Sequence, residues 1–217
     1  MSKLARAVSG KSPEPRGQLV VTAPVFRRMH IAPIVSGLLR AHSALNARLE
    51  LTDRLTRLVD EGIDVAVRIA ELTGSALHAI KIADVRRIGV ASPAYLNEHG
   101  TPREIANLHD HSLVAFDSFA SVGEWRFANP HNQVIRFVPR LLTNSIEATI
   151  DAALNGLGIA RVLSYQVARH LKERKLVRLF QVLEPTPIPV NLVFQSNRQR
   201  SPNVRALVDA TKRYFRR

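Results

Sequence analysis

Residues whose types and spacing could support chemistry are few in this chain, and the densest cluster is His109-Asp110-His111. Two imidazoles around a carboxylate can suggest a metal site, because His and Asp are both zinc ligands. The sequence places no third ligand beside them. The chain also has no cysteine, which excludes disulfides, zinc–thiolate sites and thiol catalysis. We therefore predict no metal centre.

Motifs of catalysis are missing as well. The chain contains neither the Gly-x-Ser-x-Gly turn that exposes a nucleophilic serine nor the His-Glu-x-x-His helix of zinc hydrolases. Gly156-Leu157-Gly158 is too short for a dinucleotide fingerprint, which also needs an acidic residue about 20 positions further on. Serine, acidic and histidine residues are present, but their spacing matches none of these catalytic motifs. We predict that the chain is not an enzyme and uses no cofactor.

Length and composition suit one medium domain or two small lobes. Of the 217 residues, 46% are hydrophobic and 23% are charged, which is enough apolar surface for real cores. No stretch approaches the ~20 apolar residues of a membrane span. The N-terminal residues 1–17 are basic and polar and lack the apolar region of a secretion signal. We expect a cytoplasmic protein that does not bind membranes.

The net charge of +13 invites a nucleic-acid interpretation, but its distribution argues against one. Residues 1–16, 169–178 and 198–217 carry +3, +4 and +6, so the rest of the chain is neutral. These segments are tails and helix ends, without the interleaved aromatic residues of a single-strand stacking surface. We expect nonspecific attraction to phosphates at low salt and no specific DNA binding by this chain itself.

The elements that must position any site begin with an alternation of strands and helices. Strand patterns cover residues 18–22, 48–52 and 63–69, with short links between them. The helix between the first two strands has an apolar face of Ile31, Ile34, Val35, Leu38 and Leu39. A second, short helix with Leu55, Leu58 and Val59 is predicted to end near Gly62. This order predicts a parallel sheet covered by helices on both faces.

The rest of the chain mixes shorter strands with four helices. Strand patterns occur at residues 77–82, 86–91, 113–116, 124–127, 134–137, 140–142, 159–162 and 189–195. Helices are predicted from Ser92-Pro93, over residues 164–174, and from Ser201-Pro202. Another helix follows Thr143, with Asn144 as N-cap, Glu147 as the third helical residue, and Gly156 at its end.

Several stretches together resemble the effector-binding domain of LysR-type transcription regulators. One is Leu58-Val59-Asp60-Glu61-Gly62-Ile63-Asp64-Val65-Ala66-Val67-Arg68-Ile69, and another is Ala152-Ala153-Leu154-Asn155-Gly156-Leu157-Gly158-Ile159-Ala160. The others are residues 15–24, 49–54, 91–96, 100–102, 107–111, 143–148 and 176–179. Each string is weak alone, but their order and spacing extend over nearly all of residues 15–215.

The resemblance implies an α/β fold of the type 2 periplasmic-binding-protein kind, with two lobes joined by two crossover strands. Each lobe would be a mixed sheet flanked by helices. Lobe I would take residues 17–85 and 196–217, and lobe II residues 86–195 with hinge strands near 88–92 and 192–195. Residues 1–16 would be a remnant of a linker helix. Family members carry a winged helix-turn-helix before this region, so we expect DNA binding to belong to a longer protein.

Candidate ligand contacts follow from the rule that open α/β sheets bind ligands beyond the carboxyl ends of their strands. The rule selects the segments after the first two strands, the end of the third strand, and the start of the helix after Thr143. The resemblance implies effector contacts at the same positions, in a cleft between the two lobes. The candidate residues are Thr22, Ala23, Pro24, Val25, Thr52, Asp53, Arg68, Ile69, Ala70, Thr143, Asn144, Ser145 and Phe194. Arg68 could hold a carboxylate with two hydrogen bonds.

Each candidate has a structural alternative. Thr22 and Asp53 could cap the first two helices, and Asn144 and Ser145 are caps in any case. Arg68 could pair with Asp64 or Glu71, and Phe194 suits a core better than a cleft wall.

The function implied is a sensor that binds a small organic or aromatic acid and controls transcription as a homodimer. The faces 31–39 and 55–59 are the available dimer surfaces, although both could equally cover the sheet. A freestanding solute-binding protein, or a truncated dimerisation partner of a full-length regulator, are the alternatives.

Overall fold

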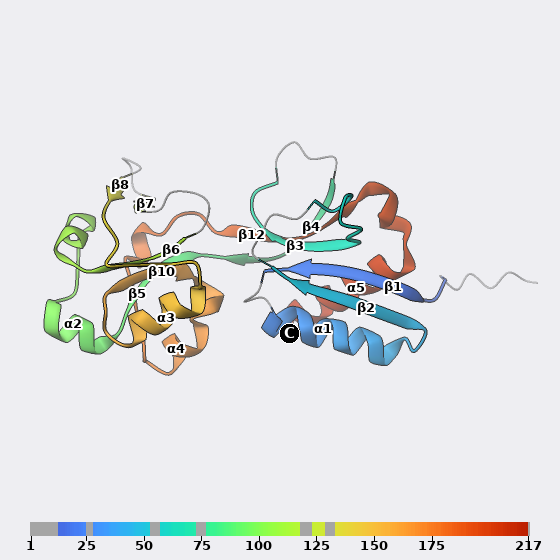
Figure 1. The fold of residues 1–217 in the computed structure, drawn as a ribbon, viewed down its shortest axis with the longest axis horizontal. Helices are drawn as coiled ribbons and strands as arrows, with labels where there is room; N and C mark the ends of the chain where they lie inside the picture. The colour runs from blue at the N-terminus through green and yellow to red at the C-terminus, as the bar shows by residue number, and fades with distance from the viewer. Residues whose placement is uncertain are drawn as a thin grey trace, which may run out of the picture. The chain divides into compact units, whose positions relative to one another are not determined.

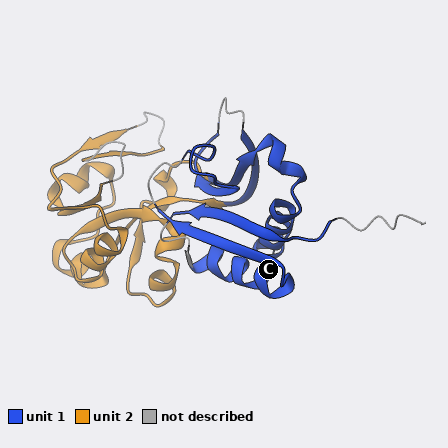
Figure 2. Cartoon of the chain, turned by 45° about the vertical axis from the view of Figure 1, so that its right-hand side comes forward, with its two compact units in different colours: residues 1–83, 189–217 blue, residues 84–188 orange. Residues whose placement is uncertain are grey.

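The computed structural model describes residues 13–24, 28–52, 57–72, 77–117, 123–128 and 133–216. The chain divides into two compact units, residues 1–83 with 189–217 and residues 84–188 (Figures 1 and 2). In this described part, no helix is long and apolar enough to cross a membrane.

Unit 1 is built on a five-stranded mixed sheet with the order β2-β1-β3-β12-β4. The strands are β1 (Gly17–Ala23), β2 (Leu45–Leu51), β3 (Val65–Ile69), β4 (Leu77–Val85) and β12 (Ile188–Gln195). Strand β1 runs parallel to both of its neighbours, β2 and β3, as the sequence pattern predicted. β12 enters antiparallel to β3 and brings the end of the chain back into this sheet. The predicted lobe boundaries and hinge strands stay predictions.

Two helices, α1 (Arg28–Ala41) and α5 (Pro202–Phe215), contact each other in unit 1. Ile31, Ile34, Val35 and Leu38 of α1 are 3–5% exposed, so its apolar face is buried within the unit. Val204, Leu207, Val208 and Thr211 form the buried face of α5. Near the end of α5, the ring of Phe215 lies 5.7 Å from that of His30 in α1. Packing of amphipathic helices on an apolar sheet thus supplies this part of the core.

The segment from residue 57 to 63 was predicted to contain the end of a helix, but it forms turns. Leu58 and Ile63 are buried against Ala66 and Val193 of the sheet, and the Ile63 amide donates to the Leu58 carbonyl at 2.9 Å. Val59 is 67% exposed and so does not belong to the apolar face assigned to it. Residues 53–56, including Leu55, lie outside the described residues.

Unit 2 has a second five-stranded mixed sheet with the order β11-β5-β10-β6-β9. These strands are β5 (Arg87–Ala91), β6 (Leu113–Phe116), β9 (Leu141–Thr143), β10 (Ile159–Leu163) and β11 (Val177–Leu179). β10 runs antiparallel to β5 and parallel to β6. A separate antiparallel pair joins β7 (Glu124–Arg126) and β8 (Val134–Arg136).

Helices and the β7–β8 pair complete unit 2. The helices are α2 (Pro93–His99), η2 (Ile105–Asp110), α3 (Ile146–Leu154), η3 (Ser164–Gln166), α4 (Ala168–Lys172) and η4 (Gln181–Leu183), while η5 (Ser196–Arg200) precedes α5 in unit 1. Tyr95, Leu108, Trp125 and Ile159 belong to one buried cluster that joins α2, η2, β7 and β10. α2 starts as predicted, since the Ser92 side chain accepts a hydrogen bond from the Tyr95 amide.

Candidate functional site

The first predicted ligand residues lie where β1 and β2 end in unit 1. Thr22 and Ala23 are the last residues of β1 and are 3% and 2% exposed. The amide of Thr52 donates to the carbonyl of Ala23 at 2.9 Å, which ties the two strand ends together. Thr22 does not cap α1, because it lies within the strand and α1 begins at Arg28. Pro24 is half-buried, while Val25 and Asp53 lie outside the described residues.

Arg68, Ile69 and Ala70 lie at the end of β3, beside the end of β1. Thr22 is in register with Ala66, so Arg68 lies just beyond the last residue of β1. Across the sheet Arg68 faces Asn191, whose side-chain amide donates to the Ala70 carbonyl at 3.0 Å. The parallel register thus brings these residues and the Thr22 segment to the same sheet edge.

The carboxylate suggested as a structural partner for Arg68 is engaged elsewhere. Asp64 lies 3.2 Å from the guanidinium of Arg198 and accepts a hydrogen bond from the Val20 amide at 2.9 Å. The possible structural pairing of Arg68 with Asp64 or Glu71 stays a prediction.

Thr143, Asn144 and Ser145 join β9 to α3 in unit 2, and the N-cap is Ser145 rather than Asn144. The Ser145 hydroxyl accepts from the Ala148 amide at 3.2 Å and lies 3.2 Å from a Glu147 carboxylate oxygen. The Ser145 amide donates to the Thr143 hydroxyl at 3.1 Å. Two of the three polar side chains therefore have structural partners, and Asn144 is exposed.

Phe194 is a core residue of unit 1. It is 1% exposed, and its ring centroid lies 5.2 Å from that of His78 in β4. This agrees with the core interpretation that the sequence favoured. The ligand contact assigned to Phe194 stays a prediction, as do the contacts assigned to the other candidate residues.

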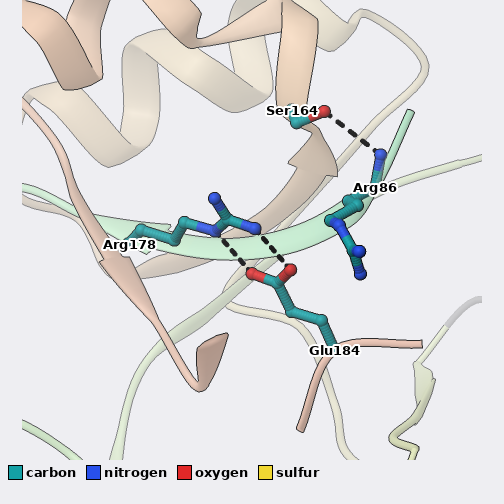
Figure 3. Close-up of polar contacts among 4 residues, drawn as sticks. All are labelled: Arg86, Ser164, Arg178 and Glu184. Carbon is teal, nitrogen blue, oxygen red and sulfur yellow. Dashed lines mark hydrogen bonds and ion pairs between the residues drawn. The ribbon is translucent and has the colours of Figure 1, made fainter. Parts of the chain in front are cut away.

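A cavity within unit 2 was not anticipated from the sequence. It has a volume of about 170 Å³ and lies at the carboxyl ends of β6 and β10. Residues from five elements and the turn after β10 contribute to its wall, among them Arg87, Phe116, Trp125, Ile146, Arg161 and Gln166. Beside it, Arg86 and Ser164 tie β5 to the end of β10: the Arg86 amide donates to the Ser164 hydroxyl at 3.1 Å (Figure 3).

Arg161 is the central charged residue of this cavity. Its guanidinium carbon lies 4.9 Å from the ring centroid of Phe127 and 5.9 Å from that of Trp125, and Nη2 donates to the Arg126 carbonyl. Burial, and then the nearby charge of Arg87, lower the pKa of Arg161 to about 10. Burial also lowers the pKa of Arg87. Both groups stay charged at neutral pH, but their charged forms are less stable here than in water.

The one carboxylate in the cavity wall is already paired. Glu124, with a side chain 15% exposed, forms ion pairs with Arg126 and Arg136 on the β7–β8 pair. Among the described residues, no carboxylate lies within ion-pair distance of Arg87 or Arg161. The sign of this cavity in the sequence is Arg161, a charged residue within an otherwise apolar segment. The sequence pattern predicts a strand over residues 159–162 and gives the arginine no role of its own.

In the segment His109-Asp110-His111, for which we predicted no metal centre, the His111 ring has a structural contact. The Tyr95 hydroxyl lies 3.0 Å from Nδ1 of His111 and accepts from the Ser112 amide at 3.0 Å. No cluster of three or more potential metal ligands occurs in the part of the chain that the structure describes.

Comparison with known proteins assigns this chain to a family. The model of the LysR substrate binding domain matches residues 12–216. The chain is 32% identical over 208 residues to the HTH-type transcriptional regulator DmlR of Escherichia coli, covering 93% of this chain and 66% of DmlR. The regulator PtxR of Pseudomonas aeruginosa is 28% identical, with 94% and 66% covered. The chain thus spans about two thirds of the length of these relatives.

A solved structure gives the same result for the fold. The regulatory domain of CrgA, a LysR-type transcriptional regulator from Neisseria meningitidis, superposes with a TM-score of 0.81 at 25% identity, covering 93% of this chain and all of that one. The predicted α/β fold of the periplasmic-binding-protein kind is confirmed. The relatives are named as transcriptional regulators, in agreement with the prediction from the resemblance.

Proposed function

Because this chain belongs to the LysR substrate-binding domain family, we propose that it is the effector-binding part of a transcription regulator and that its effector is a small anionic metabolite. The observation that carries the proposal is the family match over nearly the whole chain, on a fold shared with a regulatory domain. DNA binding and control of transcription then belong to the longer protein of which this chain forms the sensing part.

The proposed contacts in unit 1 lie at the shared edge of β1, β2 and β3. Thr22, Ala23, Pro24 and Thr52 surround the ends of two parallel strands, and Arg68 lies next to them on β3. The carboxyl edge of parallel strands is the usual ligand-binding position in α/β sheets. Arg68 supplies the positive charge and planar donors that a carboxylate needs.

In unit 2 the proposed contacts are Thr143, Asn144 and Ser145. They lie at the N-terminus of α3, where free backbone amides and the helix dipole favour negative charge. The Ser145 hydroxyl is already a cap, so its contribution to a ligand is through the backbone it positions.

A homodimer is part of the same proposal, but one of its suggested surfaces must be revised. The apolar face of α1 from Ile31 to Leu38 is buried within unit 1 and so is not available to a second copy. The exposed apolar side chains Met29 and Val59, 61% and 67% exposed, remain on the surface of that unit. Light scattering after size-exclusion chromatography tests the claim: a monomer at micromolar concentration would remove it.

The test of the effector proposal is a thermal-shift screen of the protein against small carboxylic and aromatic acids. A ligand present at 100 times its Kd stabilises the folded state by about 2.7 kcal/mol. For a chain of this size that corresponds to a rise in Tm of about 5–10 °C. A saturable rise for a group of related acids supports the proposal. A folded sample that responds to no acid in the screen contradicts an anionic effector.

A further inference from the structure

The positive charge of the chain is concentrated in unit 1, and most strongly toward its C-terminal end. Unit 1 has 19 basic and 8 acidic residues, whereas unit 2 has 12 basic and 10 acidic residues. Residues 198–217, which run from η5 to the end of the chain, contain seven basic residues and one acid, Asp209. Such an uneven distribution attracts an anionic partner to one part of the surface.

The helical period places most of these charges on one face of α5. Arg205, Asp209, Lys212, Arg213 and Arg216 recur at spacings of three and four residues, and all five are exposed. These five residues form the α5 stripe. At a rise of 1.5 Å per residue the stripe is about 16 Å long. The opposite face of α5 is apolar and is buried within unit 1.

The four cations of the α5 stripe are not neutralised by their surroundings. Among the described residues, no carboxylate lies within ion-pair distance of any of them. The neighbouring helix α1 contains no acidic residue. Glu14 is the one other acid in the groove between α1 and α5, where it lies with Asp209. The stripe therefore has a net positive charge that an external anion can balance.

Two more arginines extend the positive surface beyond the start of α5. Arg200, at the end of η5, is exposed and lines the same pocket of unit 1 as Arg205. Arg16 is also exposed, and its backbone is tied to the first turn of α5. Its amide donates to Oδ1 of Asn203 at 3.0 Å, and its carbonyl accepts from Nδ2 of Asn203 at 2.9 Å. Six cations thus lie along α5 and its start.

A nucleic-acid duplex is the polyanion that best fits this surface. A duplex carries one negative charge for about every 1.7 Å of its axis, so a stripe about 16 Å long can meet several phosphates at once. Five of the six cations are arginines, whose planar guanidinium binds a phosphate with two hydrogen bonds. Contacts of this kind hold the backbone and carry no sequence information.

Other anionic partners match the surface less well. An amphipathic helix binds a membrane by inserting its apolar face, but the apolar residues Val204, Leu207 and Val208 of α5 are buried within unit 1. A single strand is held by exposed aromatic rings that stack on its bases. The one exposed aromatic side chain of α5 is Tyr214, at 37%. The exposed face of α5 therefore favours the backbone of a duplex.

We propose that the α5 stripe, with Arg16 and Arg200, is a second contact between the regulator and DNA, which holds the phosphate backbone without reading the sequence. The inference rests on the proposed function, because attachment to the DNA-binding part of a longer protein keeps unit 1 near a duplex. Such attachment raises the effective concentration to about the millimolar range, so a weak contact still adds to affinity. Recognition of a sequence stays with the DNA-binding part.

Fluorescence anisotropy of a labelled duplex measures this contact with the intact chain and without an effector. The chain should bind duplexes of two unrelated sequences with the same Kd, in about the micromolar range at low salt. If four of the six cations reach phosphates, log Kobs should fall with log[NaCl] at a slope of about −4 between about 50 and 200 mM.

The decisive variant is the double substitution Arg205→Gln and Arg213→Gln. It should make the slope less negative by about 2 and raise the Kd at low salt roughly tenfold, because two phosphate contacts are lost. Arg205→Lys with Arg213→Lys keeps both charges and should keep the slope of the parent. Circular dichroism checks that the variants are folded. Lys212→Gln with Arg216→Gln is the second variant if the first does not fold.

Two further variants remove the same charge elsewhere. Lys172→Gln with Arg174→Gln changes two exposed residues in the basic segment of unit 2. Lys3→Gln with Arg6→Gln changes the basic N-terminal residues. Both should keep the slope of the parent, because neither pair belongs to the α5 stripe.

Any of three results would overturn the inference: an unchanged slope in folded Arg205→Gln/Arg213→Gln, an equal loss in either control, or a clear preference for one duplex sequence. Tighter binding to vesicles of phosphatidylserine and phosphatidylcholine than to the duplex would assign the stripe to a membrane instead. A thermal-shift screen in which no acid binds contradicts the anionic effector and leaves the DNA contact in place. An unchanged slope removes the DNA contact and leaves the effector proposal in place.

Discussion

The guanidinium of Arg178 holds the Glu184 carboxylate with two hydrogen bonds, from Nε to Oε1 at 2.6 Å and from Nη2 to Oε2 at 2.5 Å (Figure 3). The Glu184 side chain is only 4% exposed, whereas that of Arg178 is 32% exposed. The pair joins β11, at the edge of the unit 2 sheet, to the segment after η4. The same contact raises the pKa of Arg178, chiefly through the hydrogen bonds to Glu184.

Arg178→Gln should therefore destabilise the protein, because it leaves a buried carboxylate without its cation. We expect a loss of about 2–4 kcal/mol in the free energy of unfolding, measured by urea denaturation at pH 7. Arg169→Gln removes an exposed i,i+4 pair with Glu173 and is the matched control, with little change expected. Equal effects of the two substitutions would contradict the structural role of the Arg178–Glu184 pair.

The cap of α3 gives a prediction that separates two adjacent residues. Ser145→Ala removes the acceptor for the Ala148 amide and should cost about 1 kcal/mol of stability. Asn144→Ala, at the exposed neighbour, should change the unfolding free energy much less. Thermal unfolding of the two variants side by side makes the comparison. A larger effect at Asn144 would restore the cap assignment made from the sequence.

Local patterns made most of the fold predictable. The strand–helix alternation before Ile69 has the periodicity that burial on a parallel sheet demands. Helix α1 buries four of the five residues chosen from that pattern, Ile31, Ile34, Val35 and Leu38, and leaves Leu39 partly buried. The short helix predicted around Leu58 rests on three apolar residues, which do not define a period, and residues 58–62 form turns instead. There a turn buries Leu58 and leaves Val59 in solvent.

The cavity of unit 2 could not be predicted, because its contacts are distant in sequence. The Arg126 carbonyl that holds Arg161 is 35 residues away along the chain, and the rings above the guanidinium come from the same segment. The sequence shows only an arginine in a buried strand. The pairing of Glu124 with Arg126 and Arg136, which leaves Arg161 without an acid, depends equally on the β7–β8 register.

Gly158 is predicted to be irreplaceable. A Cβ at this position would lie 2.2 Å from the Ser112 carbonyl oxygen, which also accepts the Ile159 amide at 2.9 Å. Gly158→Ala must therefore push β10 away from the segment before β6. We expect a loss of more than about 3 kcal/mol or no soluble protein.

Gly37→Ala is the control for that substitution. Gly37 lies inside α1, and nothing lies within 4 Å of the position its Cβ would take. Alanine should leave stability unchanged or raise it by about 0.5–1 kcal/mol. A tolerated Gly158→Ala, with a Tm near that of the parent, would show that the close approach of β10 to Ser112 is wrong.

Arg68 should control affinity for any acid that binds at the edge of β1 and β3. Arg68→Gln should weaken the binding of an acid found in the thermal-shift screen roughly tenfold or more, measured by calorimetry. Arg48→Gln changes an exposed arginine of β2 paired with Glu50 and is the control in the same unit. A folded Arg68→Gln variant with unchanged affinity would exclude Arg68 from the effector site.

His111 should make stability depend on pH below neutrality. Burial lowers the pKa of His111 below 6.5, and the charge of His99 lowers it further, while Asp110 acts in the opposite direction. The Tyr95 hydroxyl, which accepts from the Ser112 amide, can donate its own hydrogen only to an unprotonated Nδ1 of His111. The folded state thus favours the neutral ring.

The sign of the effect follows from proton uptake. Between the lowered pKa of the folded state and 6.5, the unfolded chain binds more protons at His111, so this residue's contribution to the unfolding free energy falls as the pH falls through that window. His111→Gln should make the free energy of unfolding, measured by urea denaturation, less dependent on pH between pH 7.5 and the lowered pKa of the folded state. His109→Gln, on the exposed side of η2, should leave the slope as in the parent. If the unfolding free energies of the parent and of His111→Gln change with pH at the same slope, His111 has the same pKa in the folded and the unfolded state.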